Sequence, residues 1–214
     1  MKALRPGVSR LRGELEAGNY GTYGGGVVLN NSLGDGGTAW RLALHRQVSD
    51  GFRRNVYLGR NDTNGYDEST LRGKLIWQPL PQLHAALTIL YADLGNGYDA
   101  WSVDNSLVTR SNQPGRDAQR SGGAALRLSY QSAYGEWLSI SSGADSHIDY
   151  SFDGDWGNDS YWGASAPYNY FEQHLRERRN LAQDLRFIAN DSQSGFGKLR
   201  PVAGVYVSGL RESD

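Results

Sequence analysis

The chain has 214 residues, with 22 basic and 23 acidic side chains, a formal net charge of −1 and no cysteine. Basic residues scattered singly along a nearly neutral chain argue against nucleic-acid binding, and the absence of cysteine excludes a disulfide scaffold and a thiolate metal site. Twenty-eight glycines, thirteen tyrosines and six tryptophans favour an all-β chain.

Hydropathy alone would describe the chain as soluble, because its mean hydropathy is −0.60. No apolar run reaches the roughly 18 residues that a transmembrane helix needs. A transmembrane strand needs only about 9–11 residues, and only alternate side chains face lipid. A membrane β-barrel therefore remains compatible with this composition. Residues 1–10 contain no apolar stretch long enough for a signal peptide, so we expect the signal to be removed or the chain to belong to a longer one.

Nine segments have the composition of β-strands. In chain order they are residues 9–18, 22–31, 38–47, 71–78, 84–93, 124–130, 136–150, 178–189 and 200–210. Residues 171–186 have helical propensity, and we expect a strand only in the second half of that stretch.

Side-chain polarity alternates with a period of two, which is the signal of a strand. In residues 38–47, Trp40, Leu42 and Leu44 share one face and Arg41 lies on the other. The same alternation sets Leu71, Leu75 and Trp77 against Arg72 and Lys74, and Leu126, Leu128 and Tyr130 against Arg127 and Ser129.

Short and long connections alternate along the chain. The links at 33–37, 80–82, 133–135 and 191–195 are short, those at 51–65, 95–121 and 151–173 are long, and only the brief first link at 18–21 departs from this order. Outer-membrane barrels place short turns at one rim and long loops at the other. Aromatic residues near the expected strand ends fit interfacial girdles. These are Tyr20, Tyr23, Trp77, Tyr91, Tyr130, Trp137 and Tyr150.

The predicted fold is therefore all-β: an antiparallel meander of about nine long strands, part of a transmembrane β-barrel. An odd number of strands with two free edges cannot close, and hydrocarbon offers no partner for a bare backbone group. We expect residues 1–214 to be the N-terminal portion of a longer barrel.

Several segments resemble TonB-dependent outer-membrane receptors. The run from Gly51 to Pro79, with Leu71-Arg-Gly-Lys-Leu-Ile-Trp, is similar to the second outer loop and its returning strand in that family. Further similar segments are Asn96-Gly-Tyr-Asp-Ala-Trp-Ser, Gln113-Pro-Gly-Arg-Asp, Gln183-Asp-Leu-Arg-Phe and Val202-Ala-Gly-Val-Tyr. The resemblance covers about residues 9–210. It implies the first two-fifths of a barrel of about 22 strands, without the plug domain that fills the lumen.

The resemblance also implies a function: TonB-energised uptake across the bacterial outer membrane of a scarce solute such as an iron–siderophore complex. The implied partners are outer-membrane lipid, a plug domain, the TonB complex and the solute. No cofactor, metal, catalytic residue or enzymatic activity is expected. Arg41, Arg72, Lys74, Arg127 and Arg186 would face the lumen, whose walls are usually polar in any case. The candidate ligand-binding residues in the outer loops are Arg53, Arg54, Tyr57, Tyr98, Trp101, Trp156 and Tyr161.

Two alternatives stay open. A small porin-like or adhesive barrel would need an even strand count and an aromatic terminal strand, whereas the chain ends in Arg-Glu-Ser-Asp. A soluble all-β carbohydrate-binding domain could use Asp153 and Asp155, but it would leave the apolar stripe unexplained. Four aspartates, Asp149, Asp153, Asp155 and Asp159, do not have the spacing of a helix–loop–helix calcium site.

Overall fold

The computed structural model describes residues 9–34, 37–163, 168–194 and 197–214. Within these residues the elements run, in chain order, as β1 (Arg10–Ala17), β2 (Tyr23–Leu33), β3 (Thr38–Ser49), β4 (Arg54–Asn55), β5 (Tyr66–Leu80), β6 (Leu83–Tyr98), β7 (Val108–Thr109), β8 (Gly115–Gln131), β9 (Gly135–Asp153), α1 (Asp159–Trp162), β10 (Phe171–Ala189), β11 (Ser192–Ser194), β12 (Gly197–Leu199) and β13 (Val202–Ser213). No helix in the described part of the chain is both long and apolar enough to cross a membrane.

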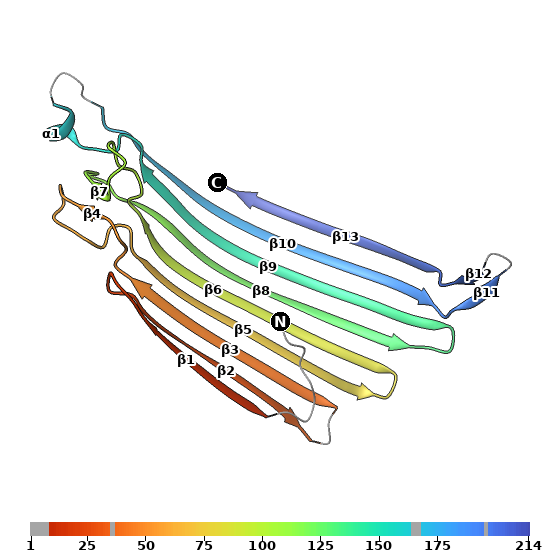
Figure 1. Cartoon of the computed structure of the whole chain (residues 1–214). Helices are drawn as coiled ribbons and strands as arrows, with labels where there is room; N and C mark the ends of the chain where they lie inside the picture. The colour runs from red at the N-terminus through yellow and green to blue at the C-terminus, as the bar shows by residue number, and fades with distance from the viewer. Residues whose placement is uncertain (1–8, 35–36, 164–167, 195–196) are drawn as a thin grey trace.

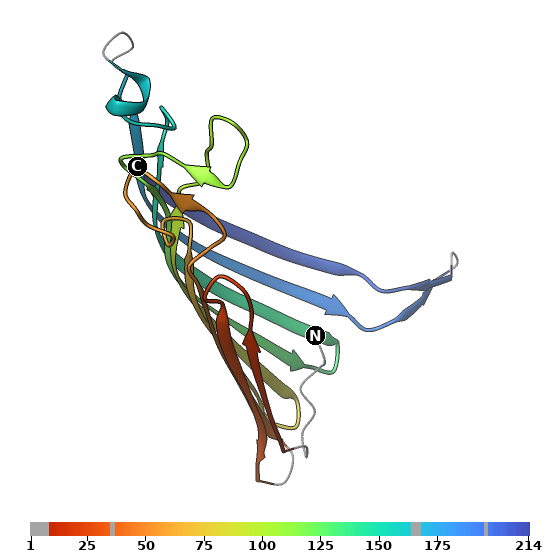
Figure 2. The same cartoon turned by 60° about the vertical axis from the view of Figure 1, so that its left-hand side comes forward.

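Nine strands form one antiparallel sheet in the order β1-β2-β3-β5-β6-β8-β9-β10-β13. Each long strand pairs with the long strand that follows it in the chain, so the sheet is a meander (Figure 1). The two views show one curved layer, with β1 and β13 at its two edges (Figures 1 and 2). The predicted all-β meander of nine long strands is confirmed.

Several strands are longer than the sequence predicted. The strand expected at 124–130 begins at Gly115, and the one expected at 84–93 continues to Tyr98. Much of the expected loop 95–121 is therefore strand, and Tyr98 is a strand residue rather than a loop residue. The last strand starts at Val202 and runs to Ser213, later at both ends than the predicted 200–210.

The helical propensity of residues 171–178 was misleading, because this stretch is the first half of β10. Phe171 pairs with Asp153 of β9, and the pairing continues without interruption to Ala189. A full ladder of backbone hydrogen bonds to β9 outweighs the weak intrinsic preference of these residues for a helix.

Cross-strand register divides the side chains between two faces. Leu42 lies opposite Leu29 of β2 and opposite Gly73 of β5, and Leu75 lies opposite Trp40 and Leu87. Residues directly opposite one another share a face, so these side chains form one continuous surface, here called the apolar face. It carries Leu11, Leu15, Val27, Leu29, Trp40, Leu42, Leu44, Leu71, Leu75, Trp77, Leu87, Ile89, Leu126, Leu128, Leu181, Leu185, Val205 and Val207.

The described residues contain almost no hydrophobic core. Only Ala39, Ala85 and Leu138 are buried hydrophobic residues, whereas Leu15 is 93% exposed and Val205 is 66% exposed. Neither face of the sheet is covered by another layer in the described part of the chain (Figure 2). Such a sheet cannot be stable in water by burial of apolar surface alone.

Connection lengths agree with the predicted alternation. The loops after β3, β6 and β9 carry β4, β7 and α1 and gather at one end of the sheet, here called the loop end (Figure 1). The turns after β5 and β8 are short and lie at the other end. The link after β10 is longer than the predicted 191–195, because β11 and β12 pair as a small hairpin. Parts of three predicted links, residues 35–36, 164–167 and 195, lie outside the described residues, as does most of the segment 1–10.

Aromatic residues mark the apolar face at the end of the sheet that carries the short turns, here called the turn end. Tyr130 lies directly opposite Trp137, and the ring centroid of Trp137 is 4.8 Å from that of Phe187. Tyr91 lies farther along the same face, opposite Leu71. Tyr150 was expected to belong with these residues, but it lies opposite His174 on the other face of the sheet. It therefore cannot take part in a girdle on the apolar face.

Candidate functional site

The loops at the loop end are packed through buried polar groups. Asp99, which follows β6, is 3% exposed, and its Oδ2 accepts hydrogen bonds from Asn55 Nδ2 at 2.9 Å, Thr63 Oγ1 at 2.7 Å and Thr109 Oγ1 at 2.7 Å. Three donors on one carboxylate oxygen tie loop 51–65 to loop 99–114. The parallel pairing of β4 with β7 adds backbone hydrogen bonds between the same two loops.

Loop 51–65 also approaches the end of β6 very closely. A Cβ atom at Gly97 would lie 2.3 Å from the carbonyl oxygen of Thr63. Only glycine permits this contact, which brings Thr63 within reach of Asp99. The loops are therefore held in one arrangement by local backbone fit as well as by side-chain hydrogen bonds.

Two tryptophans of the predicted ligand-binding set are in direct contact. Trp101 and Trp156 stack with ring centroids 5.4 Å apart and an interplanar angle of 4°, and both side chains are about two-fifths exposed (41% and 40%). Their loops are far apart in the sequence, so this pair is created by tertiary structure. An exposed stacked pair offers a flat apolar platform with polar edges.

The backbone at Trp156 is strained in order to present this ring. Its φ angle is 60°, in the left-handed region that bulky residues rarely adopt. Asp155 holds the turn, because its Oδ1 accepts from Gly157 N at 2.8 Å and its Oδ2 accepts from Tyr170 N at 3.0 Å. The Asp155 carboxylate therefore links the residue that follows Trp156 to the segment that leads into β10.

The remaining predicted loop residues are not gathered around this pair. The Arg110 guanidinium lies 5.0 Å from the ring centroid of Tyr161. Arg53 Nη1 donates to the carbonyl oxygen of Ser106 at 3.1 Å. Arg54 lies in β4, and Tyr57 is a half-exposed residue of the same loop. The structure therefore brings together two of the seven candidates, Trp101 and Trp156, in one surface.

A second group of rings surrounds Tyr98. The Tyr98 and Tyr150 centroids are 5.1 Å apart, and the series continues through Phe152 to Tyr170 and Tyr168, with centroid distances of 5.9, 6.4 and 6.2 Å. These other rings were not among the residues expected to bind a ligand. Two pairs, Tyr150 with Phe152 and Tyr168 with Tyr170, have the i, i+2 spacing that could have indicated a shared face.

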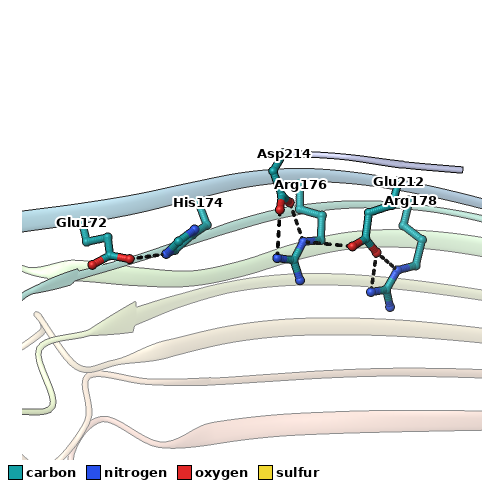
Figure 3. Close-up of polar contacts among 6 residues, drawn as sticks. All are labelled: Glu172, His174, Arg176, Arg178, Glu212 and Asp214. Carbon is teal, nitrogen blue, oxygen red and sulfur yellow. Dashed lines mark hydrogen bonds and ion pairs between the residues drawn. The ribbon is translucent and has the colours of Figure 1, made fainter.

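Six charged or titratable residues of β10 and the C-terminal strand region form a row beside these rings, here called the polar ladder (Figure 3). Its members are Glu172, His174, Arg176, Arg178, Glu212 and Asp214. Glu172 Oε1 lies 2.6 Å from His174 Nε2, and Arg176 Nε donates to Asp214 Oδ1 at 2.6 Å. Arg178 Nε donates to Glu212 Oε2 at 2.5 Å. Every ladder residue therefore has a partner of complementary character.

The five residues expected to face the lumen all lie on the face opposite the apolar face. Arg41 is directly opposite Lys74, Arg72 is two residues from Lys74 on β5, Arg127 is opposite Ile140, and Arg186 is opposite Leu138. They differ in their surroundings: Arg127 lies 4.0 Å from Glu136, and Arg186 pairs with Asp184. Their shared face agrees with the alternation in the sequence.

Asp153 at the end of β9 is a buried carboxylate. It is 4% exposed, and its Oδ1 accepts a hydrogen bond from Asp155 N at 3.2 Å. Burial, followed by the nearby charge of Asp155, raises the pKa of Asp153 to about 6. Among the described residues, no group of three or more His, Cys, Asp or Glu side chains is arranged to hold a metal ion.

A likeness to a solved structure agrees with this geometry. The chain resembles the siderophore receptor PiuA from Acinetobacter baumannii with a TM-score of 0.74 and 13% sequence identity, over 98% of this chain and 31% of the receptor. The likeness shows a shared fold, that of an antiparallel nine-stranded section of a β-barrel. The chain spans less than a third of the length of that receptor. No protein-family model and no curated protein matches the sequence.

Proposed function

We propose that the chain is a membrane-embedded section of the wall of a bacterial outer-membrane receptor. The observation that carries this proposal is the exposed apolar face of a sheet with a receptor-barrel fold. The strands suit the role, since β5 has 15 residues and β9 has 19, more than the roughly 9–11 needed to cross hydrocarbon.

The apolar face changes character toward the loop end, as the surface of a bilayer requires. Beyond the leucines, ion pairs replace apolar side chains on the same face: Arg46 with Asp67 at 2.8 Å and Arg120 with Asp93 at 3.2 Å. Lipid head groups and water can solvate such charges, whereas the hydrocarbon core cannot. The long loops at the loop end, opposite the short turns, support an orientation with the loop end outside the cell.

The proposed activity is reception of a scarce solute such as an iron–siderophore complex, with uptake energised by the TonB complex through a plug domain. The loop end supplies the capture surface, with the stacked Trp101 and Trp156 as an apolar platform and Tyr98 in the neighbouring ring group. Aromatic surfaces with a few charged groups suit a bulky chelate. This role is that of a binding and transport protein rather than an enzyme.

Single-cysteine labelling tests the membrane assignment directly, because the natural chain has no cysteine. A polarity-sensitive probe would be attached at positions 42, 44 and 75 on the apolar face, and at positions 41 and 74 on the opposite face as matched controls. We expect an apolar signal only at the first three positions in liposomes. A uniformly wet signal would overturn the membrane proposal and favour a soluble carbohydrate-binding domain.

Ligand capture is tested by titrating the folded chain with ferric chelates and recording tryptophan fluorescence. Quenching that saturates in the natural chain should be lost in Trp156→Ala and kept in Trp137→Phe, which lies on the apolar face at the turn end. Equal quenching in both variants would remove the tryptophan platform from the proposal.

A further inference from the structure

Two carboxylates lie buried close together where β9 ends, and no basic side chain neutralises them. Asp153 and Asp155 are each 4% exposed. The acidic residue before them on β9, Asp149, lies 3.5 Å from Arg116. In the part of the chain that the structure describes, no basic side chain pairs with Asp153 or Asp155. Burial of a carboxylate is costly unless a cation or hydrogen-bond donors compensate for its charge.

Hydrogen bonds satisfy both carboxylate oxygens of Asp155 but leave one oxygen of Asp153 without a partner. The two Asp155 oxygens accept from Gly157 N at 2.8 Å and from Tyr170 N at 3.0 Å. Asp153 Oδ1 accepts from Asp155 N at 3.2 Å, whereas Asp153 Oδ2 is a buried atom with no hydrogen-bond partner. Such unpaired buried atoms are rare in folded proteins, and a bound ion is one of the few reasons for them.

Two further oxygens without a partner lie in the segment that approaches Asp153. Ser111 is 2% exposed, and its Oγ has no hydrogen-bond partner. The next residue, Asn112, likewise has a buried Oδ1 without a partner. The Ser111 side chain lies near the Asp153 carboxyl group, since it acts to lower the pKa of Asp153 against the effect of burial. Unpaired oxygens therefore come from two loops that adjoin one another at the loop end.

Backbone hydrogen bonds hold these oxygens in place. Asn112 N donates to the carbonyl oxygen of Gly157 at 3.1 Å, which joins the two loops directly. Asn55 Nδ2 donates to the carbonyl oxygen of Ser111 at 2.8 Å and to Asp99 Oδ2 at 2.9 Å. The backbone of Ser111 is thus tied to the buried network around Asp99, while its hydroxyl group stays available to a ligand.

We propose that a calcium ion binds between the two loops, with Asp153 Oδ2 and Ser111 Oγ as ligands and Asn112 Oδ1 as a further oxygen beside them. Calcium binds about six to eight oxygen atoms in flexible geometry, and water completes its shell. The ion would compensate for the two buried carboxylates and stabilise the charged form of Asp153, whose pKa burial raises in the cation-free chain. It would also fix the turn that presents Trp156, whichever solute the chain binds.

Terbium luminescence of the full chain, folded in neutral detergent, tests the site, because terbium(III) binds oxygen ligands as calcium does and emits when a tryptophan lies nearby. Trp162 Nε1 donates to the carbonyl oxygen of Asp155 at 3.2 Å, so a tryptophan ring lies close to the proposed ion. We expect saturable emission that calcium chloride displaces with a Kd of about 10⁻⁴–10⁻³ M. Asp153→Asn should weaken calcium binding by about tenfold or more, and Ser111→Ala by about threefold, because affinity depends on the number and charge of the ligands.

Asp159→Asn is the matched control, because Asp159 is an exposed acidic residue of the same loop. It should change the affinity for calcium by less than about twofold. Far-UV circular dichroism would verify that each variant folds, and Ser111→Ala keeps the test decisive if Asp153→Asn does not fold.

Two results would overturn the proposal. No saturable emission from the folded natural chain would mean that a proton or a water molecule, rather than a metal ion, satisfies Asp153. Equal losses of affinity in Asp159→Asn and Asp153→Asn would mean general attraction of cations to an acidic loop rather than a site. The cysteine-labelling test of the apolar face does not depend on calcium, so failure of the site and failure of the receptor proposal are distinguishable.

Discussion

Asp99→Ala removes the acceptor that joins two loops at the loop end. In the natural chain, the buried Oδ2 of Asp99 accepts hydrogen bonds of 2.7–2.9 Å from the side chains of Asn55, Thr63 and Thr109. The Asn55 amide also donates to the carbonyl oxygen of Ser111 at 2.8 Å, so it keeps one acceptor when the carboxylate is removed. A hydrogen bond to a charged group contributes about 1.5–3 kcal/mol, and three that share one oxygen are not additive. We expect the free energy of loop opening to fall by about 3–5 kcal/mol, without global unfolding.

Amide hydrogen exchange read by mass spectrometry measures this loss locally. Peptides covering residues 51–65 and 99–114 should exchange about a hundredfold faster or more in Asp99→Ala, and strand peptides should not change. Asp104→Ala is the matched control, because Asp104 lies in the same loop but is exposed and accepts only local bonds from Ser102 Oγ at 2.6 Å and Ser106 N at 3.0 Å. Exchange that rises equally in both variants would refute the view that Asp99 holds the loops together.

Three further perturbations follow from the same geometry. Because burial raises the pKa of Asp153, ionising this carboxyl group opposes folding. The neutral carboxyl group therefore stabilises the folded loop fully below its ordinary pKa of 3.8, and this stabilisation is lost as the pH rises through about 6. The amide hydrogen exchange rate of Gly157, corrected for the intrinsic effect of pH on exchange, should rise from pH 4 to pH 7 as the free energy of loop opening falls by roughly 2–3 kcal/mol. Asp153→Asn should abolish this dependence on pH. Trp156→Gly relieves the backbone strain of the positive φ angle, so the loop should resist proteolysis better in this variant than in Trp156→Ala. Both variants should lose the quenching of tryptophan fluorescence by ligand. Greater cleavage of the glycine variant would contradict the strain argument. Leu87→Arg on the apolar face should lower the stability of the membrane-inserted state by about 2–4 kcal/mol, whereas Ser142→Arg, on the opposite face between Ala125 and Ala182, should change it little. Equal losses in denaturant titrations in liposomes would argue against lipid at Leu87.

Strand positions and the division of side chains between two faces could be predicted from the sequence. In a strand each residue points to the opposite side from its neighbour, so local alternation already separates Leu71 and Leu75 from Arg72 and Lys74. The order of the strands followed from the expectation that antiparallel strands adjacent in the chain are also adjacent in the sheet. Local propensity failed at residues 171–178, where pairing with β9 outweighs an intrinsic preference on the order of 0.5 kcal/mol per residue.

The arrangement of the loops and the pairing of charges were decided by tertiary structure. No pattern near Trp101 indicates that Trp156 will stack on it, and nothing in the sequence around Asp99 indicates that three donors converge on it. Likewise, five cations looked equivalent in the sequence, but register places Glu136 beside Arg127 and Arg41 opposite Lys74. Face alternation is a property of each strand by itself, whereas these contacts depend on register and loop conformation across segments distant in the chain, which only the folded sheet brings together.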